Sequence, residues 1–463
     1  MPYRDRNQHG LVAPADLAAD IFESLARQFP VCMASDEFHY FPQAVSRAFD
    51  WRRWDDFSPG AVADIITRLK GWEGELQGAV RFSPPPPEDV DRALLLRSVR
   101  TLREQLEEVR VHESQPTFYL TIAGIGLAEA YAAGAGAFDL RLAHLPAFFE
   151  QAVGNLSRLP RLFRDLGAEM LAMQHRWLRS LALPEDRSAP VQRAYERLGR
   201  HLEDAPVCEE FLPSADLYER IARNHMGCGL PPADIARELA LEKAETQAAL
   251  AASSAAVAPG RPWQAAVANL PPPARPSGGA GELYARAIGE LARHCVQIDL
   301  VPSEVVEACP VRVEGIPDYM RPVRSNAAFS MPPGHPPRGG TFFILDTGPG
   351  AAIPPDYRLL SAHETYPGHH LLDTCRWRHP RPVRRHLEFP VFYEGWASFA
   401  EELLFETGFF GGAVDRLLMA KRRFWRALRG QVDFDLHVGR RSPDGAAALL
   451  VSHGLPARRA EAM

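Results

Sequence analysis

The sequence of 463 residues contains few cysteines and no block of positive charge. Its six cysteines are scattered, and no two of them form the C-x-x-C pair of many metal and redox sites. They indicate reduced thiols of a cytoplasmic protein rather than a disulfide framework. The formal net charge is only −6. This mild balance argues against nucleic acid or an anionic membrane as a partner.

Long apolar runs are also missing. No apolar core of signal-peptide length follows residues 1–7. The segment closest to a membrane span is 117–138, but Glu129 and its glycine-rich end favour a tightly packed helix pair. We therefore expect a cytoplasmic location and no membrane partner. An apolar fraction of 46% is ordinary for globular proteins and excludes a wholly disordered chain.

Strand-like segments are scarce. Only 311–313 and 340–345 are notably rich in β-branched and aromatic residues. Apolar residues at helical spacing recur along the chain instead, for example over 16–28. We predict a mainly α protein: a large α-helical, metallopeptidase-like body with a small β-sheet or hairpin beside the metal-site helix described below.

The length alone allows two or three domains. Residues 1–250 are predicted to be mostly helical and to form the walls of a cleft. Residues 251–279 are rich in Ala, Ser, Pro and Gly and predict a loop or linker, with an interrupted helix as the alternative. Residues 280–463 carry the chemistry-bearing motifs. A site built from these motifs needs surrounding helices to enclose it, so we expect one compact body rather than independent domains.

Residues 361–370 hold the densest group of metal-binding residue types, three histidines and one glutamate. Hydrolytic zinc enzymes place His-Glu on a helix and a second histidine one turn later. Here the pair is His363-Glu364, and a proline–glycine pair separates it from His369 and His370. The usual H-E-x-x-H spacing is therefore interrupted.

The backbone at the proline–glycine pair decides whether these histidines can share an ion. In an unbroken helix His363 and His369 would differ by about 120° and about 9 Å of rise, and His370 would lie about 10.5 Å along the axis. Pro367 cannot donate a helical hydrogen bond, and Gly368 can adopt angles closed to other residues. Together they could widen the turn by two residues and place His369 as the second ligand. The alternative is a helix end surrounded by polar histidines.

A helix predicted over 392–404 offers a third ligand. Glu394 follows His369 by 25 residues, enough chain for a loop and a returning helix. Catalytic zinc sites of the His₂Glu type use such a carboxylate. The alternative is a carboxylate near a helix N-terminus, where the dipole favours it.

The two motifs resemble those of a bacterial family, domain of unknown function family 885. H-E-T-Y-P-G-H-H and E-G-W-A in this chain are similar to the family's H-E-x-x-P-G-H and E-G-W-A. Segments 217–233, 328–344 and 426–437 support the resemblance, which covers roughly residues 90–445. In the family, the histidine directly after proline–glycine is the regular member of the motif and the next position is looser, which implies His369 rather than His370 as ligand.

The resemblance implies a zinc-dependent, gluzincin-like hydrolase. We expect a carboxypeptidase-like or oligopeptidase-like peptidase, or an amidase, acting on short peptides or an amide-containing small molecule. His363, His369 and Glu394 would bind one Zn²⁺ per chain. Glu364 would take a proton from water and return it to the leaving amine.

Further residues are candidates for supporting roles. Asp373 or Glu401 could orient a ligating imidazole, and the sequence does not choose between them. His437 is a catalytic candidate, and Arg426 and Arg429 are substrate-binding candidates. These three could neutralise an oxyanion or bind a terminal carboxylate.

The strand over 340–345 includes Phe342 and Phe343, which are also substrate-binding candidates. An exposed strand edge can accept an extended peptide as one more strand. A purely structural hairpin is the alternative.

Two departures from the family pattern keep other functions open. Phe329-Ser330 stands where the family usually has two tyrosines, and the chain stops at Met463, which suggests a shortened C-terminus. A non-catalytic member that binds a ligand or partner is one alternative. The other is a non-haem iron or manganese enzyme, since two histidines and one carboxylate also suit these metals. Neither substrate identity nor oligomeric state is predicted.

Overall fold

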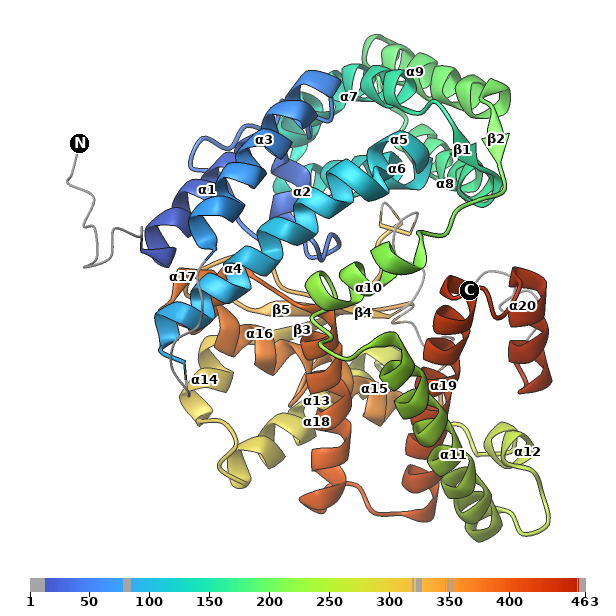
Figure 1. Ribbon diagram of the computed structural model, residues 1–463. Coiled ribbons are helices and arrows are strands. Elements are labelled where there is room, and N and C mark those ends of the chain that lie inside the picture. The colour runs from blue at the N-terminus through green and yellow to red at the C-terminus, as the bar shows by residue number, and fades with distance from the viewer. Residues whose placement is uncertain are drawn as a thin grey trace. The chain divides into compact units, whose positions relative to one another are not determined.

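The computed structural model describes residues 13–77, 85–318, 320–321, 327–345, 347, 350, 353–455 and 457 (Figure 1). The chain divides into two compact units, each made of separate segments. Unit 1 comprises residues 1–211, 315–345 and 373–390, and unit 2 comprises 212–314, 346–372 and 391–463.

Unit 1 is built mostly from long helices, and prolines at the first helical positions start several of them. Its long helices are α1 (Pro14–Gln28), α3 (Pro59–Leu76), α4 (Pro87–Glu104), α6 (Pro116–Ala133), α7 (Ala135–Asn155), α8 (Arg161–Ser180) and α9 (Glu185–Asp204). Its short helices are α2 (Pro30–Ala34), the π-helical turn η1 (Gln105–Val109), α5 (Val111–Ser114) and α17 (Pro382–His386).

The apolar stretch near residues 117–138 forms α6 and the start of α7. Nearly every side chain of α6 over 118–128 is buried, and α6 packs against α7, as the prediction of a tight helix pair requires. Among the described residues, no helix has both the length and the apolar character needed to span a membrane.

The strands are short. β1 (Leu159–Pro160) pairs in parallel with β2 (Val207–Cys208). β4 (Ala328–Ser330) pairs antiparallel with β5 (Gly340–Ile344), which places Phe329 opposite Phe342. With β3 (Val311–Gly315), these strands confirm the prediction of a mainly α protein with a small β-sheet.

Unit 2 carries the chemistry-bearing motifs. Its helices are α10 (Ala215–Asn224), α11 (Pro232–Val257), α12 (Trp263–Ala268), α13 (Gly279–Gln297), α14 (Ser303–Ala308), α15 (Tyr357–Glu364), the start of α16 (His369–Arg378), α18 (Pro390–Glu406), α19 (Ala413–His437) and α20 (Pro443–Ser452). α11 and α19 run side by side (Figure 1).

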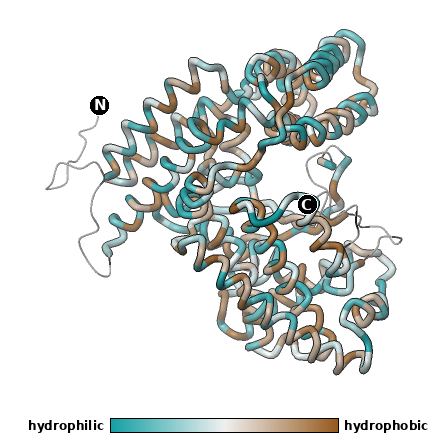
Figure 2. Tube along the Cα trace, turned by 45° about the vertical axis from the view of Figure 1, so that its right-hand side comes forward, coloured by the Kyte–Doolittle hydropathy of each residue, from teal (hydrophilic) through white to brown (hydrophobic). Residues whose placement is uncertain are grey.

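The core beside α19 explains how this helix presents its polar face. Leu417, Phe424 and Leu428 of α19 are buried against Leu250 of α11 and Ala266 of α12. Apolar and polar stretches alternate along the helices of this unit (Figure 2). The apolar stripe fixes the rotation of α19, so its other face is free to carry the arginines described below.

Candidate metal centre

The proline–glycine break shapes the backbone between α15 and α16. The N–H of Gly368 donates to the carbonyl of Ala362 at 3.0 Å, and the N–H of Leu371 donates to the carbonyl of Thr365 at 3.2 Å. Both bonds span six residues instead of the four of an α-helix. The turn therefore holds two extra residues, as the widened-turn hypothesis requires.

Gly368 is the residue that permits this turn. A Cβ atom at this position would lie 1.8 Å from the carbonyl oxygen of His363 and 2.5 Å from that of Ala362. Both are backbone atoms, which cannot rotate away as a side chain could. The preceding Tyr366–Pro367 peptide bond is cis. Only glycine fits this backbone path.

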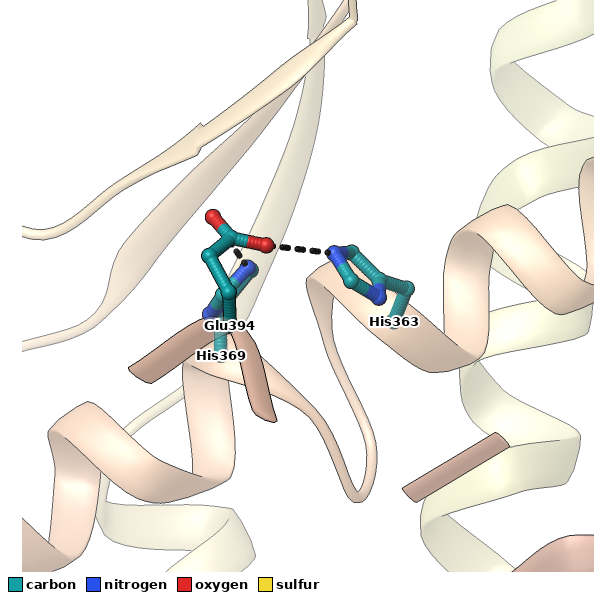
Figure 3. A group of neighbouring side chains, drawn as sticks. All are labelled: His363, His369 and Glu394. Atoms are coloured by element: carbon teal, nitrogen blue, oxygen red, sulfur yellow. Dashed lines mark ion pairs between the residues drawn. The ribbon is translucent and has the colours of Figure 1, made fainter. Parts of the chain in front are cut away.

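The break brings His363 and His369 together with Glu394 of α18 (Figure 3). Nε2 of His363 lies 3.3 Å from one carboxylate oxygen of Glu394, and Nε2 of His369 lies 3.7 Å from the other. One ligand atom from each residue lies within 4.8 Å of the others. Two ligands of a tetrahedral zinc ion are about 3.4 Å apart, given bonds near 2.1 Å. The three residues therefore fit one such ion after a small closure.

The three side chains differ in exposure. The side chains of His363 and His369 are only 9% and 6% exposed, whereas that of Glu394 is 61% exposed. The buried imidazoles are held by packing, and the carboxylate marks a side that solvent reaches. Catalytic zinc sites keep one open position, whereas structural sites are closed by four protein ligands. The observed arrangement resembles the open type.

Glu401 orients the imidazole of His363. Its Oε1 lies 3.0 Å from Nδ1 of His363, and its side chain is fully buried. Arg422 donates to both carboxylate oxygens at 3.1 and 2.9 Å, and Arg426 also donates to them. Burial alone would raise the pKa of Glu401, but Arg422, His363 and Arg426 together hold it well below its usual range.

The ionised Glu401 determines the tautomer of His363. A carboxylate can only accept, so Nδ1 of His363 carries the hydrogen and donates it to Glu401. The Nη2 of Arg426, 3.3 Å from the same Nδ1, is then a packing contact rather than a hydrogen-bond donor to it. In the neutral ring the lone pair is then on Nε2, the atom that faces Glu394, as in carboxylate–histidine–metal arrangements. Asp373, the other candidate for this role, pairs with Arg376 at 2.8 Å.

The surroundings of His363 favour a positive charge. Burial alone would lower its pKa, yet hydrogen bonds with Glu394 and Glu401 raise it to about 9 in the absence of a metal. The same two carboxylates would stabilise any cation at this point.

His369 and His370 face different surroundings. The ring of His369 stacks on Tyr393 at 4.1 Å and lies edge-on to His363 at 4.8 Å. The ring of His370 is fully buried, and its Nε2 lies 2.9 Å from the carbonyl of Cys309. Burial lowers the pKa of His370 to about 4, so its neutral ring donates to that carbonyl. The structure places His369 with Glu394 and His370 in the core.

Trp396 ties α18 to the break. Its indole Nε1 donates to the carbonyl of Pro367 at 2.9 Å. Glu394 precedes it by two residues, so the same helical turn carries the third carboxylate and the anchor. The E-G-W-A motif therefore has a structural role beside its candidate ligand.

The other site candidates lie at different distances from this group. Glu364 ends α15, and its charge raises the pKa of both His363 and Arg422, which places it within electrostatic reach of the group. His437 is 11 residues beyond Arg426 on the same face of α19, about 16 Å along the helix. Its ring stacks on Tyr218 at 4.5 Å. The structure does not bring His437 to the three metal candidates.

Phe342 and Phe343 belong to strand β5 of unit 1. The ring of Phe342 is fully buried, so a substrate contact, which stays a prediction, would require this ring to become exposed. Phe343 is half-buried. Its role in substrate binding stays a prediction.

Arg422 and Tyr393 were not predicted from the sequence. Arg422 precedes Arg426 by four residues on α19, and this spacing places both guanidinium groups on one helical face. That spacing was the available signal for Arg422. The stacking of Tyr393 on His369 had no comparable signal, because it depends on how α18 packs.

A cavity of about 520 Å³ lies elsewhere in unit 2. Helices α11, α18 and α19 line it with Glu245, Glu402 and Arg423 among others. None of its lining residues is one of the three metal candidates, and Arg423 is occupied by ion pairs with Glu242 and Glu402.

Comparison with known proteins gives a family and a fold. Residues 44–462 match the family described as "Bacterial protein of unknown function (DUF885)". No curated protein matches the chain significantly. A solved structure described as "a putative lipoprotein of unknown function" from Shewanella oneidensis has a TM-score of 0.69 and 15% identity, over 97% of this chain and 88% of that one. A "putative lipoprotein" from Colwellia psychrerythraea gives 0.75 and 15%, over 97% and 87%. At such identity the likeness shows the fold alone.

Proposed function

Because the chain belongs to the DUF885 family, whose description assigns no activity, we propose a function from the geometry of the site: a zinc-dependent hydrolase, a peptidase or amidase. The observation that carries the proposal is the meeting of His363, His369 and Glu394, with Glu401 behind His363. This set combines the ligands of an open zinc site with the outer carboxylate that such ligands require.

Each residue of the group has a separate task in the proposed reaction. His363, His369 and Glu394 would hold one Zn²⁺ per chain. A bound zinc ion acidifies water and polarises a carbonyl. Glu364 takes the proton of the attacking water and later delivers it to the leaving amine. Glu401 keeps the Nδ1 hydrogen of His363 in place, which holds its Nε2 toward the group.

The exposed side of the group is where a substrate would approach. Glu394 is mostly exposed, whereas the two imidazoles are almost completely buried. We propose short peptides or small amide-bearing molecules as substrates, carboxypeptidase-like or oligopeptidase-like in reaction type.

The test combines metal analysis with a substrate screen. We expect about one zinc per purified chain, and hydrolysis of members of a short-peptide library that a chelator abolishes. His369→Ala and Glu394→Gln should lose the zinc. Glu364→Gln should keep the zinc but lose turnover by at least about 100-fold. His144→Ala, which removes an exposed histidine of α7, is the control for loss of an imidazole.

Three results would change the proposal. Unchanged zinc in His369→Ala would show that the ligand set is wrong. Bound iron or manganese, with oxygen consumption, would support the non-haem alternative. Stoichiometric zinc without hydrolysis of any library member would support a non-catalytic binding protein.

A further inference from the structure

Three arginines follow one face of α19, and their partners differ. Arg422, Arg426 and Arg429 are spaced by four and three residues, which places their side chains in one row. Arg422 and Arg426 both bond to Glu401. Arg429 forms no hydrogen bond or ion pair with any residue that the structure describes. Its side chain is exposed, so an anion from solution can reach it.

The carboxylate that could pair with Arg429 within the helix is turned elsewhere. Asp433 follows it by four residues, the spacing at which opposite charges meet on a helix. Instead, Oδ2 of Asp433 lies 3.4 Å from the hydroxyl of Tyr218, and Oδ1 lies 3.5 Å from Nδ1 of His437. The arrangement therefore leaves the guanidinium of Arg429 available.

Arg429 also lies close to the metal candidates. Arg426, whose Nη2 is 3.3 Å from Nδ1 of His363, precedes it by three residues, or about 4.5 Å along the axis. Although the residue is exposed at the surface, neighbouring protein atoms desolvate part of its side chain, and this is the largest influence lowering the pKa of Arg429. The positive charges of Arg426 and Arg422 lower it further, and the carboxylate of Glu394 opposes them. A second anion near Arg429 would relieve this repulsion between arginines.

We propose that Arg429 binds a carboxylate of the substrate, so that the preferred substrates carry a free carboxylate within about one residue of the scissile amide. This inference rests on the proposed hydrolase function. A guanidinium binds a carboxylate through two parallel hydrogen bonds, a geometry that lysine cannot reproduce. Arg426 has the same group but is occupied by Glu401, so it positions His363 rather than the substrate. The carboxylate can come from a C-terminus or from an acidic side chain.

Binding measured without turnover tests the proposal. The probes are an equimolar pool of random tripeptides with free C-termini and the same pool as C-terminal amides, analysed by equilibrium dialysis and mass spectrometry. Zinc-loaded Glu364→Gln protein serves as the non-cleaving background. We expect the free acids to bind about 10- to 100-fold more tightly than the amides.

Substitutions in α19 test whether Arg429 causes the preference for free acids over amides. In Arg429→Gln, the affinities for the free-acid and amidated pools should differ by no more than about threefold. Arg429→Lys should keep only part of the parent protein's preference for the free acids. Arg423→Gln is the matched control, since Arg423 is on the same helix but is paired with Glu242, and it should keep the full preference. In the active protein the loss in Arg429→Gln should appear mainly in KM.

The outcomes separate this proposal from the hydrolase function. A preference that survives in Arg429→Gln would overturn the role of Arg429. So would a parent protein that favours neither the free acids nor the Asp-containing and Glu-containing amides. Enrichment of Asp-containing and Glu-containing amides would support it, with a side chain as the source of the carboxylate. Zinc content and chelator-sensitive cleavage of the amidated pool report on the hydrolase function independently of these results.

Discussion

At the scale of single residues, the arrangement of the metal candidates depends on Gly368, which is not itself a candidate ligand. Gly368 lets the chain pass so close to the carbonyls of Ala362 and His363 that no side chain fits there. Histidine and glutamate supply the chemistry, but the glycine determines whether the two imidazoles meet.

We therefore expect Gly368→Ala to lose zinc. The added Cβ would have to displace backbone, at a cost of roughly 2–4 kcal/mol in the free energy of unfolding. Zinc content and urea unfolding measure the two effects. Gly395→Ala is the matched control: it adds a methyl next to Glu394, but nothing lies within 4 Å of the new atom. It should keep zinc and gain about 0.5–1 kcal/mol, because alanine favours the helix. An alanine at 368 that leaves zinc and stability unchanged would show that the turn can form another way.

The sequence predicts the members of this group better than the contacts among them. Residue type and the family motif pointed to His363, His369 and Glu394, and the widened turn followed from the properties of proline and glycine. The choice of Glu401 over Asp373 could not be predicted. It depends on which carboxylate α18 and α16 bring to Nδ1 of His363, and chain spacing does not contain that information.

At the scale of elements, the helical spacing of apolar residues predicted most of the observed helices. Composition gave a wrong prediction in one segment. Residues 251–279 were predicted to be a loop or linker, yet α11 continues to Val257 and α12 follows at Trp263–Ala268. Alanine has the highest helix propensity, and Leu250 and Ala266 are buried against α19. A stretch low in large apolar residues can therefore be helical when a neighbouring helix covers it.

Glu401 joins three elements, since it lies on α18 and bonds to His363 of α15 and to two arginines of α19. We expect Glu401→Gln to weaken zinc binding by about 10- to 100-fold, because a neutral amide holds the imidazole less firmly. It should also lower the free energy of unfolding by roughly 3–5 kcal/mol, since buried arginine charge would lose its counter-ion. Zinc titration and urea unfolding check both values.

The neighbouring glutamate provides the control for this change. Glu402 is partly exposed and pairs with Arg423 at 3.3 Å, so Glu402→Gln should cost less than about 1 kcal/mol and leave zinc binding unchanged. Equal losses in the two variants would mean that the helix, rather than the carboxylate at 401, supports the site.

At the scale of the whole molecule, the two units differ in what they contribute. Unit 2 contains all three metal candidates and the arginine row, whereas the largest apolar core belongs to unit 1. Structures with 15% identity retain the fold over 97% of the chain. Packing of this kind tolerates extensive exchange of apolar side chains, so the fold can persist while sequences diverge.

One acidic residue of the unit 1 core should make the folded state less stable as the pH rises. Asp55 is buried and accepts hydrogen bonds from the N–H groups of Val31 and Cys32 at 2.7 and 3.1 Å. Burial raises its pKa from 3.8 to about 6, although hydrogen bonds with Cys32 and Val31 and the charge of Arg141 oppose this shift. The folded state thus holds a proton that the unfolded state releases near pH 4. The penalty for ionising Asp55 grows as the pH rises from about 4 to about 6 and then stays near 3 kcal/mol.

Comparison with Asp55→Asn isolates this group, because other titrating residues are the same in both proteins. We expect the free energy of unfolding of the parent protein, relative to the asparagine variant, to fall by about 2–2.5 kcal/mol between pH 4 and pH 7 in urea titrations. Asp50→Asn should show the opposite sign: Arg52 lowers the pKa of Asp50 to about 2, so its stabilisation is lost only as the pH falls below about 4. Parallel curves for the parent protein and Asp55→Asn would mean that Asp55 is ionised in the folded state over this range, with Arg141 outweighing burial.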